Sequence, residues 1–566
     1  MKLLGLSAFH RDAAAAVVVD GVVIASVQED RFTKRLQDES FPIRAARACL
    51  EEAGLQMRDL DGVVFYEKPL RKFERVLATQ LGAFPRSARS FSRNMFLWLG
   101  DRLWMKNRIA EELEWSDTSR IYFTEHQLAH AASAFFPSPF DEAAVLTVDD
   151  VGEWATTTLC KGSGQSLELL SEVRFPDSLG MFVSAIAQYL GLEPGAQDAQ
   201  LEALAPYGTP RFLEEFRALV PAADAGAFTV DQTAFRYAFD HATLYSDELE
   251  ARLGPARIGT SPLRFVGEDR RDADVAASLQ ALLEERVLEL CAALHERTGL
   301  ASLCFAGILA ENRTLCARLL KDGPFERLYV PACPDDAGAA LGAALYVHAA
   351  LEPDTPCRPL PDAYLGMPVE ERPEEGAVTL PDVHAALLSR LTAGGRVAWV
   401  RGRLELGPRS QGHRGLFANP RPADARTRLQ EAVQHAEPFL PIRVAVPAER
   451  AIDFFDLPTG AEHPLRLGQL FVPASAELRE RAPSAVRPDG TAWPQLVHAD
   501  EDPELHRLLI AFGEATGAPL LLHETFALRG SPIVRIESDA HDAFQRSTLD
   551  ALVVEDRLYE RDGVHA

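Results

Sequence analysis

Residues 2–30, KLLGLSAFHRDAAAAVVVDGVVIASVQED, decide the fold. They contain three β-prone runs, and the second turn between them is Asp20-Gly21, a dipeptide typical of a tight hairpin. A second set of three runs begins at Ala143 with AAVLTVDD, EWATTTLCKG and SLELLSEVRF. A helical pattern follows the first set, and helices are expected to dominate residues 181–300. The repetition predicts a duplicated α/β domain.

Two β-β-β-then-helix units in one chain are the arrangement of the actin-like ATPases, in which the first hairpins face each other across a nucleotide cleft. Residues 351–380 are rich in Pro, Glu and Asp, which is typical of a boundary between domains. A second α/β unit starts near residue 390 with the strand RVAWVRG. We therefore expect a first domain at 1–350, a linker at 351–390 and a second domain at 391–566.

Bulk properties restrict the class of protein. The chain has 566 residues, too many for one hydrophobic core. Its net charge of -25 argues against nucleic acid or an anionic membrane as a primary partner. Seven cysteines without CxxC spacing fit neither a disulfide framework nor a zinc site, and they predict buried thiols. With no long apolar run and no signal-peptide pattern, a cytoplasmic protein is expected.

Four side chains could hold a metal ion. The stretch EHQLAHAASAFF predicts a helix, so His126 and His130, at i and i+4, share one face. Asp149 ends the apolar strand AAVLTV, and Asp336 precedes a small-residue helix. Each residue has a plainer interpretation: two buried helical histidines, a turn residue, and a helix N-cap at Asp336. Their combination predicts a site of two imidazoles and two carboxylates.

The chain resembles the NodU/CmcH carbamoyltransferases over nearly its whole length. In the first half the resembling stretches are LGLSAF, VVVDGVVIASVQEDRFTK, FYEKPLRKFER, HQLAHAASAFFPSPFDEAAVLTVDDVGEWATT, FPDSLGMF, LAPYGTP and PDDAGAALGAAL. In the second half they are GRLELGPRSQGHRGLFANPR, DGTAWPQ and LRGSPIV. The resemblance implies an actin-like ATPase (ASKHA, Kae1-like) domain followed by a YrdC-like α/β domain.

The resemblance also implies a reaction. Carbamoyl phosphate and ATP would form carbamoyladenylate in the second domain, and the first domain would transfer the carbamoyl group to a hydroxyl or amine of a small-molecule acceptor, as in antibiotic biosynthesis and other secondary metabolism. Iron(II) is the implied metal, although a site of two nitrogens and two oxygens also accepts manganese or zinc, and magnesium is a possible companion of ATP. A homodimer is the implied assembly.

The implied site residues are carried over by motif. The metal ligands fall on His126, His130, Asp149 and Asp336. The catalytic pair falls on His10 and Asp12, and the nucleotide-binding residues fall on Gly152, Glu153, Gly307 and Asn312. The carbamoyl phosphate and ATP site of the second domain falls on Arg403, Arg409, Arg414, Thr491 and Arg529. Arginine suits this role because its guanidinium binds phosphate bidentately, although Arg409 could instead pair with Glu405.

The first domain departs from the family pattern at two places. The family's His-Asp pair after the first strand becomes Phe9-His10-Arg11-Asp12, which puts the histidine one residue out of register. A cation at Arg11 is expected to lower the pKa of His10 and favour a neutral base. The family's Gly-Gly turn becomes Gly307-Ile308, and its Glu and Lys upstream of LAPYG become Asp198 and Gln200.

The second domain departs more strongly. The family's Lys-x-Arg-Glu-x-Phe-Arg-Pro becomes QHAEPFLP at 434–441, so three cationic positions are neutral. Its His before DGTA is Arg487, its following Arg is Trp493, and its Asn-Thr-Ser-Phe-Asn is HETFA at 523–527. Each lost charge-assisted bond to phosphate is worth roughly 1.5–3 kcal/mol. His435 and Arg487 could compensate, but neither occupies a vacated position.

Three functions therefore remain open. The first is ATP-dependent carbamoyl transfer by the family reaction. The second is a different acyl or group transferase or condensing enzyme that keeps the metal cleft and accepts another activated donor. The third is a non-catalytic partner in a biosynthetic cluster. Assay of carbamoyl phosphate activation separates the first function from the other two.

Overall fold

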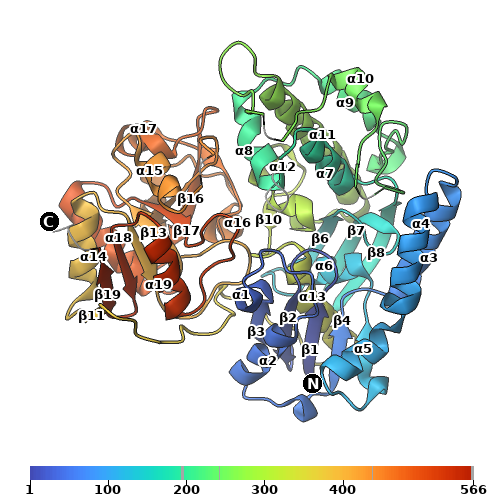
Figure 1. Ribbon diagram of the computed structural model, residues 1–566, viewed down its shortest axis with the longest axis horizontal. Coiled ribbons are helices and arrows are strands. Elements are labelled where there is room, and N and C mark those ends of the chain that lie inside the picture. The colour runs from blue at the N-terminus through green and yellow to red at the C-terminus, as the bar shows by residue number, and fades with distance from the viewer. Residues whose placement is uncertain (193–196, 241, 260, 436, 562–566) are drawn as a thin grey trace. The chain divides into compact units, whose positions relative to one another are not determined.

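The computed structural model describes residues 1–192, 197–240, 242–259, 261–435 and 437–561 (Figure 1). It divides into two compact units, one of Met1–Ile24 with Phe41–Leu360 and one of Ala25–Ser40 with Pro361–Ala566. The division after residue 360 falls inside the expected linker. Two parts of that prediction differ from the structure: residues 351–360 belong to the first unit, and helix α14 (Val383–Thr392) begins within the linker.

The first unit contains two five-stranded sheets. The first sheet is formed by β1 (Lys2–Ser7), β2 (Ala14–Val19), β3 (Val22–Gln28), β4 (Gly62–Phe65) and β5 (Ile121–Phe123), in the order β3-β2-β1-β4-β5. Asp20 and Gly21 both have positive φ, as a two-residue hairpin turn requires. Strand β1 runs antiparallel to β2 and parallel to β4.

The second sheet repeats this order. It is formed by β6 (Glu142–Val148), β7 (Ala155–Ser163), β8 (Ser166–Arg174), β9 (Ser302–Ala306) and β10 (Arg327–Tyr329), in the order β10-β9-β6-β7-β8. Strand β6 takes the place of β1, antiparallel to β7 and parallel to β9. The duplicated actin-like arrangement predicted from the sequence is therefore confirmed in the strand order.

The helices of the first unit surround these sheets. They are α2 (Ile43–Glu52), α3 (Pro69–Gly82), α4 (Ala88–Gly100), α5 (Met105–Glu112), α6 (His126–Phe135), α7 (Leu179–Tyr189), α8 (Gln197–Leu204), α9 (Leu213–Leu219), α10 (Asp247–Leu253), α11 (Arg271–Thr298), α12 (Arg313–Asp322) and α13 (Asp336–Leu351). The expected dominance of helices over 181–300 holds only in part, because the described residues of 220–246 and 254–270 are mostly irregular.

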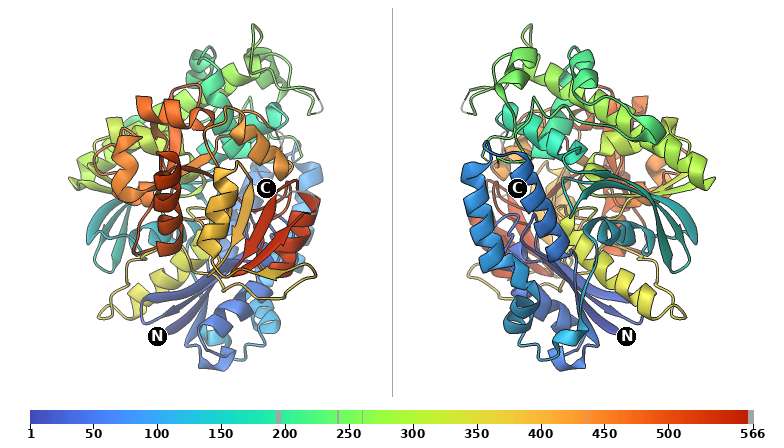
Figure 2. Two further views of the ribbon diagram at one scale, coloured as in Figure 1. Left: turned by 90° about the vertical axis from the view of Figure 1, so that its left-hand side faces the viewer. Right: turned by 90° about the vertical axis from the view of Figure 1, so that its right-hand side faces the viewer.

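Helices α6 and α13 bring the two halves of this unit together. Helix α13, yellow beside the blue strands in the right-hand view of Figure 2, packs on β1 and β2, whereas α6 packs on β6 and β9. The two helices also pack on each other. A Cβ on Gly342 of α13 would lie 1.9 Å from the carbonyl oxygen of Ala129, so only glycine allows this approach. The small residues of α13 thereby fix the position of α6.

We expect Gly342→Ala to destabilise the chain by about 1–3 kcal/mol, because the added methyl forces α6 and α13 apart. The measurement is thermal unfolding together with metal content, since α6 carries both candidate histidine ligands. Gly82→Ala in α3 is the matched control: its Cβ meets no atom within 4 Å, so no loss of stability is expected. Equal stability of the two variants would contradict the packing argument.

The second unit is built on one mixed sheet, in the order β11-β19-β18-β12-β13-β17-β14-β16-β15. Its strands are β11 (Val378–Thr379), β12 (Val397–Val400), β13 (Arg414–Ala418), β14 (Arg443–Pro447), β15 (Val472–Pro473), β16 (Thr491–Val497), β17 (Leu521–Thr525), β18 (Ala551–Val554) and β19 (Arg557–Glu560). Its helices are α14, α15 (Ala425–Ala432), α16 (Glu462–Arg466), α17 (Ala476–Arg481), α18 (Pro503–Thr516) and α19 (Glu537–Arg546). Helices α14 and α18 pack together and share a core with Trp399 and Phe417.

A segment from the N-terminal part of the sequence completes this second unit. Residues 25–40 include the end of β3 and the short helix α1 (Asp30–Thr33). The buried guanidinium of Arg31 donates to the carbonyl oxygen of Gly407 at 2.7 Å and to the side-chain oxygen of Gln28 at 3.0 Å. The backbone amide of Gly407 donates to the same Gln28 oxygen at 3.3 Å. The sequence alone predicts that this segment belongs to the first domain, residues 1–350.

All seven cysteines are buried and free, as predicted. Within the part of the chain that the structure describes, no helix is long and apolar enough to cross a membrane.

Candidate functional site

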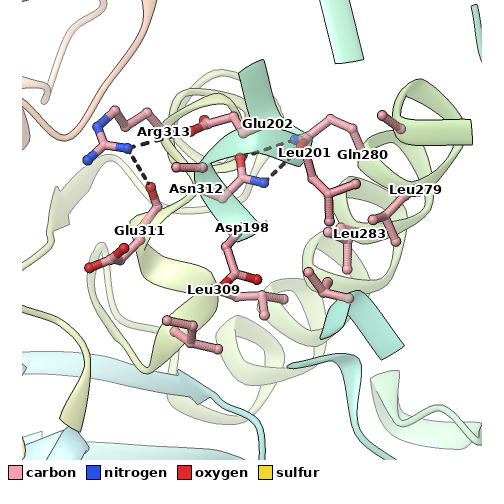
Figure 3. A pocket seen from close by; sticks show the side chains of 14 residues that line it. Asp198, Leu201, Glu202, Leu279, Gln280, Leu283, Leu309, Glu311, Asn312 and Arg313 are labelled. Carbon is pink, nitrogen blue, oxygen red and sulfur yellow. Dashed lines mark hydrogen bonds and ion pairs between the residues drawn. The ribbon is translucent and has the colours of Figure 1, made fainter. Parts of the chain in front are cut away.

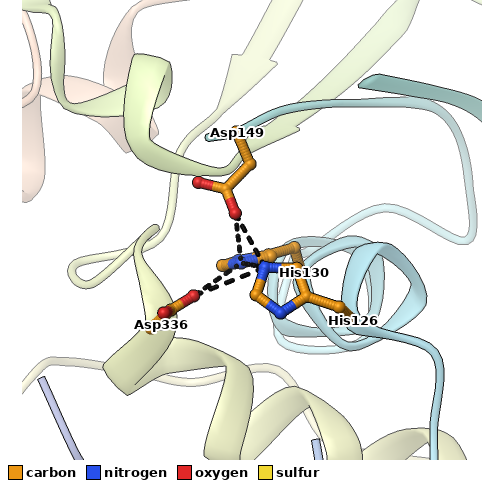
Figure 4. Close-up of side chains that lie close together, drawn as sticks. All are labelled: His126, His130, Asp149 and Asp336. Atoms are coloured by element: carbon orange, nitrogen blue, oxygen red, sulfur yellow. Dashed lines mark hydrogen bonds and ion pairs between the residues drawn. The ribbon is translucent and has the colours of Figure 1, made fainter. Parts of the chain in front are cut away.

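The four predicted metal ligands lie together in the first unit (Figure 4). His126 and His130 lie one turn apart on α6, Asp149 follows the last residue of β6, and Asp336 is the first residue of α13. One ligand atom from each residue falls within 4.8 Å of the others, and all four residues are buried. Residues separated by 210 positions are thus brought to one point by β6 and the α6–α13 pair.

The distances within this cluster are those of ligands around one ion. The Nε2 atom of His126 lies 2.7 Å from Asp149 Oδ2 and 3.2 Å from His130 Nε2. His130 Nε2 lies 3.3 Å from Asp149 Oδ2 and 3.2 Å from Asp336 Oδ1. Metal bonds of about 2.0–2.2 Å place neighbouring ligands roughly 2.8–3.6 Å apart. A divalent ion with two carboxylates and two neutral imidazoles would also have zero net charge, which suits a buried site.

The second oxygen of each carboxylate is held by the protein. Asp149 Oδ1 accepts a hydrogen bond from the backbone amide of Ile308 at 3.1 Å, and Asp336 Oδ2 lies 2.7 Å from His10 Nδ1. Such contacts orient metal ligands. The N-cap interpretation of Asp336 is wrong, because Asp335 caps α13 by accepting from the amide of Ala337. Asp336 therefore keeps its carboxylate for the cluster.

The charges in the cluster depend strongly on one another. Burial alone would raise the pKa of Asp149, but His130 and His126 outweigh it and hold that pKa well below its usual range. Burial alone would lower the pKa of His130, yet Asp149 and Asp336 raise it to about 10. The cluster without metal is thus an ion-pair network, and a metal ion must displace a proton from His130 at neutral pH.

The structure brings His10 to the cluster through a tight turn. Phe9 and Asp12 both have left-handed φ, so the loop absorbs the extra residue seen in the sequence. The expected lowering of the pKa of His10 is wrong. Burial does lower it, but Asp336 outweighs burial and the pKa is raised.

Arg11 has little effect on His10 because its guanidinium is engaged elsewhere. It pairs with Asp150 at 3.2 Å and with Asp198 at 3.0 Å, and it donates to the Ser184 hydroxyl at 3.3 Å. These contacts join the β1–β2 loop to the β6–β7 loop and to α8. Asp12 is buried, and its charge contributes to raising the pKa of the Cys333 thiol, for which burial is the largest cause.

Two of the four predicted nucleotide-binding residues, Gly152 and Glu153, contact the start of α6, which carries the two candidate histidine ligands. The carboxylate of Glu153 accepts from the backbone amide of His126 at 3.1 Å and from that of Lys68 at 2.7 Å, so it anchors the first turn of α6. Gly152 packs against His126, where a Cβ would lie 3.2 Å from the histidine Cβ. The carboxylate of Glu153, which was predicted to bind nucleotide, is therefore already hydrogen-bonded to backbone amides.

The other two lie beside a cavity between α7, α8, α11 and α12 (Figure 3). Asn312 lines it, caps α12 through Leu315 and exchanges side-chain hydrogen bonds with Gln280 at 2.7 and 3.3 Å. Gly307 has a φ of 86°, and a Cβ there would lie 2.3 Å from the Val148 carbonyl oxygen. The Ile308 side chain lines the same cavity.

Sequence reasoning missed some members of this region. The amide of Ile308 is a backbone group, which no motif reports. Gln280 lies on α11, 32 residues before Asn312, and Arg11 was considered only for its effect on His10. Arg11 could have been identified from its position in the loop between the first two strands, because the actin-like fold turns that loop toward the nucleotide cleft.

In the second unit, Arg403 and Arg414 are engaged with the backbone. Arg403 donates to the carbonyl oxygen of Gly366 at 3.0 Å. Arg414 is fully buried and donates to the carbonyl oxygens of Arg401 and Gly402. Burial lowers the pKa of Arg414 to about 10, although Glu405 opposes the shift. Both guanidinium groups therefore stabilise the 401–414 loop.

The remaining three predicted residues of this unit also contact protein groups. The guanidinium of Arg409 lies 4.9 Å from the ring centre of Trp493, and Arg529 pairs with Glu437 at 2.7 Å. The Thr491 hydroxyl donates to Asp489 at 2.6 Å.

Glu405 does not use its carboxylate on Arg409, contrary to the alternative considered from the sequence. One oxygen accepts from the Ser410 hydroxyl at 2.9 Å and from the amides of Gln411, His413 and Arg414 at 2.8, 2.8 and 3.1 Å. The loop is thus folded around this carboxylate.

The chain matches models of one family in both halves. A model described as carbamoyltransferase N-terminus matches residues 2–345, and one described as carbamoyltransferase C-terminus matches residues 388–561. An uncharacterized protein of Synechocystis is 36% identical, over 98% of this chain and 95% of that protein. Nodulation protein NolNO of Sinorhizobium fredii is 32% identical, over 98% of this chain and 79% of its own length.

A 3'-hydroxymethylcephem-O-carbamoyltransferase of Streptomyces clavuligerus is 30% identical, over 54% of this chain and 57% of that enzyme. Among solved structures, the activator of 2-hydroxyisocaproyl-CoA dehydratase from Clostridium difficile with bound ADPNP aligns at a TM-score of 0.34 and 14% identity, covering 62% of this chain and 97% of that chain.

Proposed function

Because this chain belongs to the carbamoyltransferase family and is a transferase, we propose that it moves a carbamoyl group from carbamoyl phosphate, by way of carbamoyladenylate and with ATP, to a hydroxyl or amine of a natural product. The observation that carries the proposal is the buried cluster of His126, His130, Asp149 and Asp336 beside His10. A homodimer is the proposed assembly.

The cluster is proposed to hold iron(II) or another divalent first-row metal. Two imidazoles and two carboxylates suit iron, manganese or zinc, whereas magnesium prefers oxygen ligands and would accompany the ATP phosphates. Such an ion would supply charge to offset the adenylate phosphate and to polarise the carbonyl. The amide of Ile308 and the ring of His10 orient the two carboxylates around it.

His10 is proposed to be the base for the acceptor. Its Nδ1 atom lies against Asp336 Oδ2, so a proton on Nδ1 leaves the lone pair of Nε2 for an incoming hydroxyl. The side chain is 28% exposed, in contrast to the two buried histidines of the cluster, so an acceptor can reach it. Asp336 thus orients the imidazole as the carboxylate does in an Asp-His pair.

The cavity lined by Asn312, Gln280 and Ile308 is proposed to take the nucleoside of ATP or of the adenylate. Its apolar wall includes Leu279 and Leu283 of α11, and its polar groups include Asp198 and Glu311. Gly307 keeps the neighbouring backbone close to β6, and so beside Asp149, which places this cavity next to the metal cluster.

A second candidate function rests on the second unit. Arg403 and Arg414 donate to backbone carbonyls, and Arg529 is paired with Glu437. Because these arginines are bonded to protein groups and the positions at 434–441 are neutral, we favour here a group transferase or condensing enzyme that receives an activated donor made elsewhere. Arg409 beside Trp493 would then contact that donor.

The deciding experiment gives the purified full chain ATP, carbamoyl phosphate and iron(II) or manganese. Pyrophosphate release is measured, and carbamoyladenylate is followed by mass spectrometry. Formation of both is expected from the first proposal and excludes the second. Absence of both, with stoichiometric metal still bound, excludes the first proposal and supports the second. A chain that binds neither metal nor nucleotide contradicts both.

A further inference from the structure

Arg75 on α3 is a buried cation that lies against a phenylalanine ring and forms no ion pair among the described residues. Its side chain is 8% exposed, and its guanidinium lies 4.8 Å from the ring centre of Phe175. Its Nε atom has no hydrogen-bond partner. Among the residues that the structure describes, none forms an ion pair or a side-chain hydrogen bond with this guanidinium. Burial lowers the pKa of Arg75 to about 10, against the pull of Glu67 and Glu153, so the group remains charged at neutral pH.

Other buried arginines, including Arg31 and Arg414, also leave Nε without a hydrogen bond, so what distinguishes Arg75 among the described residues is the lack of bonds to its terminal nitrogens. Arg31 donates to Asp30, Gln28 and the Gly407 carbonyl, and Arg414 donates to backbone carbonyls. A buried charge that lacks such bonds costs several kcal/mol, because desolvation is not compensated. We therefore expect Arg75 to lower the stability of the folded chain when no anion is bound to it.

The two nearest carboxylates are engaged with other groups. Glu67 pairs with Lys72, one turn before Arg75 on α3, and Glu153 accepts from the amides of Lys68 and His126. Neither can turn to Arg75 without releasing a buried donor. The guanidinium therefore offers its N–H groups to a ligand, with the Phe175 ring fixing its plane.

Charged groups near Arg75 also act on the candidate site. Glu153, whose charge acts on Arg75, binds the first amide of α6 at His126. Lys72, on the same face of α3, has a charge that acts on His10. Helices α3 and α4, which lie side by side at the edge of this unit in Figure 2, pack through Phe73 and Trp98 and hold this face in place.

We propose that Arg75 binds an oxyanion, a carboxylate or a phosphate, of the acceptor, and so selects acceptors that carry such a group in addition to the hydroxyl or amine that receives the carbamoyl group. That the oxyanion belongs to the acceptor rests on the proposed function. That Arg75 binds an oxyanion does not. Bidentate guanidinium–oxyanion bonds supply both affinity and orientation. Lys72, one turn earlier on α3, is already paired with Glu67, so the oxyanion is left to Arg75.

The test uses the full chain, inorganic phosphate and acetate as probes, and the Arg75→Met variant, which keeps the length of the side chain and removes its charge. Without ligand we expect Arg75→Met to unfold at a higher temperature than the wild type. Phosphate or acetate is expected to raise the unfolding temperature of the wild type, with a half-maximal concentration at least about 10-fold lower than for Arg75→Met. Arg75→Lys should retain part of this response.

Arg31→Met is the matched control, because Arg31 is also buried but its two terminal nitrogens donate to Asp30, Gln28 and the Gly407 carbonyl; it is expected to lower stability. A lower unfolding temperature or loss of folding in Arg75→Met, or an unchanged response to both anions, would overturn the proposal. The readout is independent of transfer. If carbamoyladenylate formation fails while the Arg75-dependent anion response persists, the proposed function is wrong and the oxyanion site stands.

Discussion

The His126→Gln variant is expected to bind divalent metal at least about 100-fold more weakly than the wild type, and to lose transferase activity to the same degree or more. Loss of a residue that only orients a ligand already costs roughly 10–100-fold in affinity, so loss of a ligand costs more. The Nε2 atom of His126 is 2.7 Å from Asp149 and 3.2 Å from His130, so its removal opens one side of the cluster. The measurement is metal content after equilibration with iron(II), manganese or zinc.

The matched control for this variant is His348→Gln. His348 is as buried as His126 but lies in the last turn of α13, where its Nε2 contacts the Thr355 carbonyl oxygen at 2.9 Å. It should leave metal content unchanged. Full metal content in His126→Gln would show that the cluster is an ion-pair network only.

We expect Glu405→Ala to destabilise the second unit by about 4 kcal/mol or more. Four donors, the Ser410 hydroxyl and the amides of Gln411, His413 and Arg414, would lose their acceptor at once. Each buried donor left without a partner costs roughly 1–3 kcal/mol. Urea unfolding of the full chain measures the effect, and Glu405→Gln, which keeps an acceptor oxygen, should lose less.

The same carboxylate predicts a dependence of stability on pH. Burial opposes its ionisation, but His413, Arg414 and the donated hydrogen bonds hold the pKa of Glu405 below its ordinary value. Its contribution is therefore complete above about pH 4.3, the pKa of an unfolded glutamate, and is lost as pH falls through the lower folded pKa. Glu477→Ala is the control, because Glu477 only pairs with Arg481 on an exposed helix face. If the stability of both variants has the same pH dependence, the carboxylate of Glu405 does not stabilise the loop.

The grouping of the four candidate metal ligands could be predicted from the sequence, in part because local rules favour it and in part because the family resemblance implies it. Histidines four residues apart share a helix face, and a carboxylate directly after a buried strand lies at the edge of a sheet. The N-cap interpretation of Asp336 needed the structure to be decided, since it is Asp335 that caps α13. The repeated strand order was equally accessible, because three β-prone runs with tight turns occur twice.

The surroundings of the site could not be predicted, because they depend on contacts between distant segments. The effect of Arg11 on His10 was misjudged, since Asp198, the partner that holds Arg11 away, comes 187 residues later. Glu153 and Arg414 are residue types suited to binding nucleotide or phosphate, but their side chains are hydrogen-bonded to backbone groups. No spacing rule distinguishes a side chain that binds a ligand from one that binds its own chain.

The segment 25–40 has a consequence for the order of folding. Ribosomes release this segment early, yet its partner Gly407 is made 376 residues later. The C-terminal unit therefore needs residues 25–40 to complete its structure. These residues are synthesised long before the rest of that unit. A polypeptide of residues 361–566 would lack the buried Arg31 and Gln28, leaving the Gly407 amide and carbonyl exposed. Folding of the C-terminal unit is therefore expected to depend on the N-terminal segment.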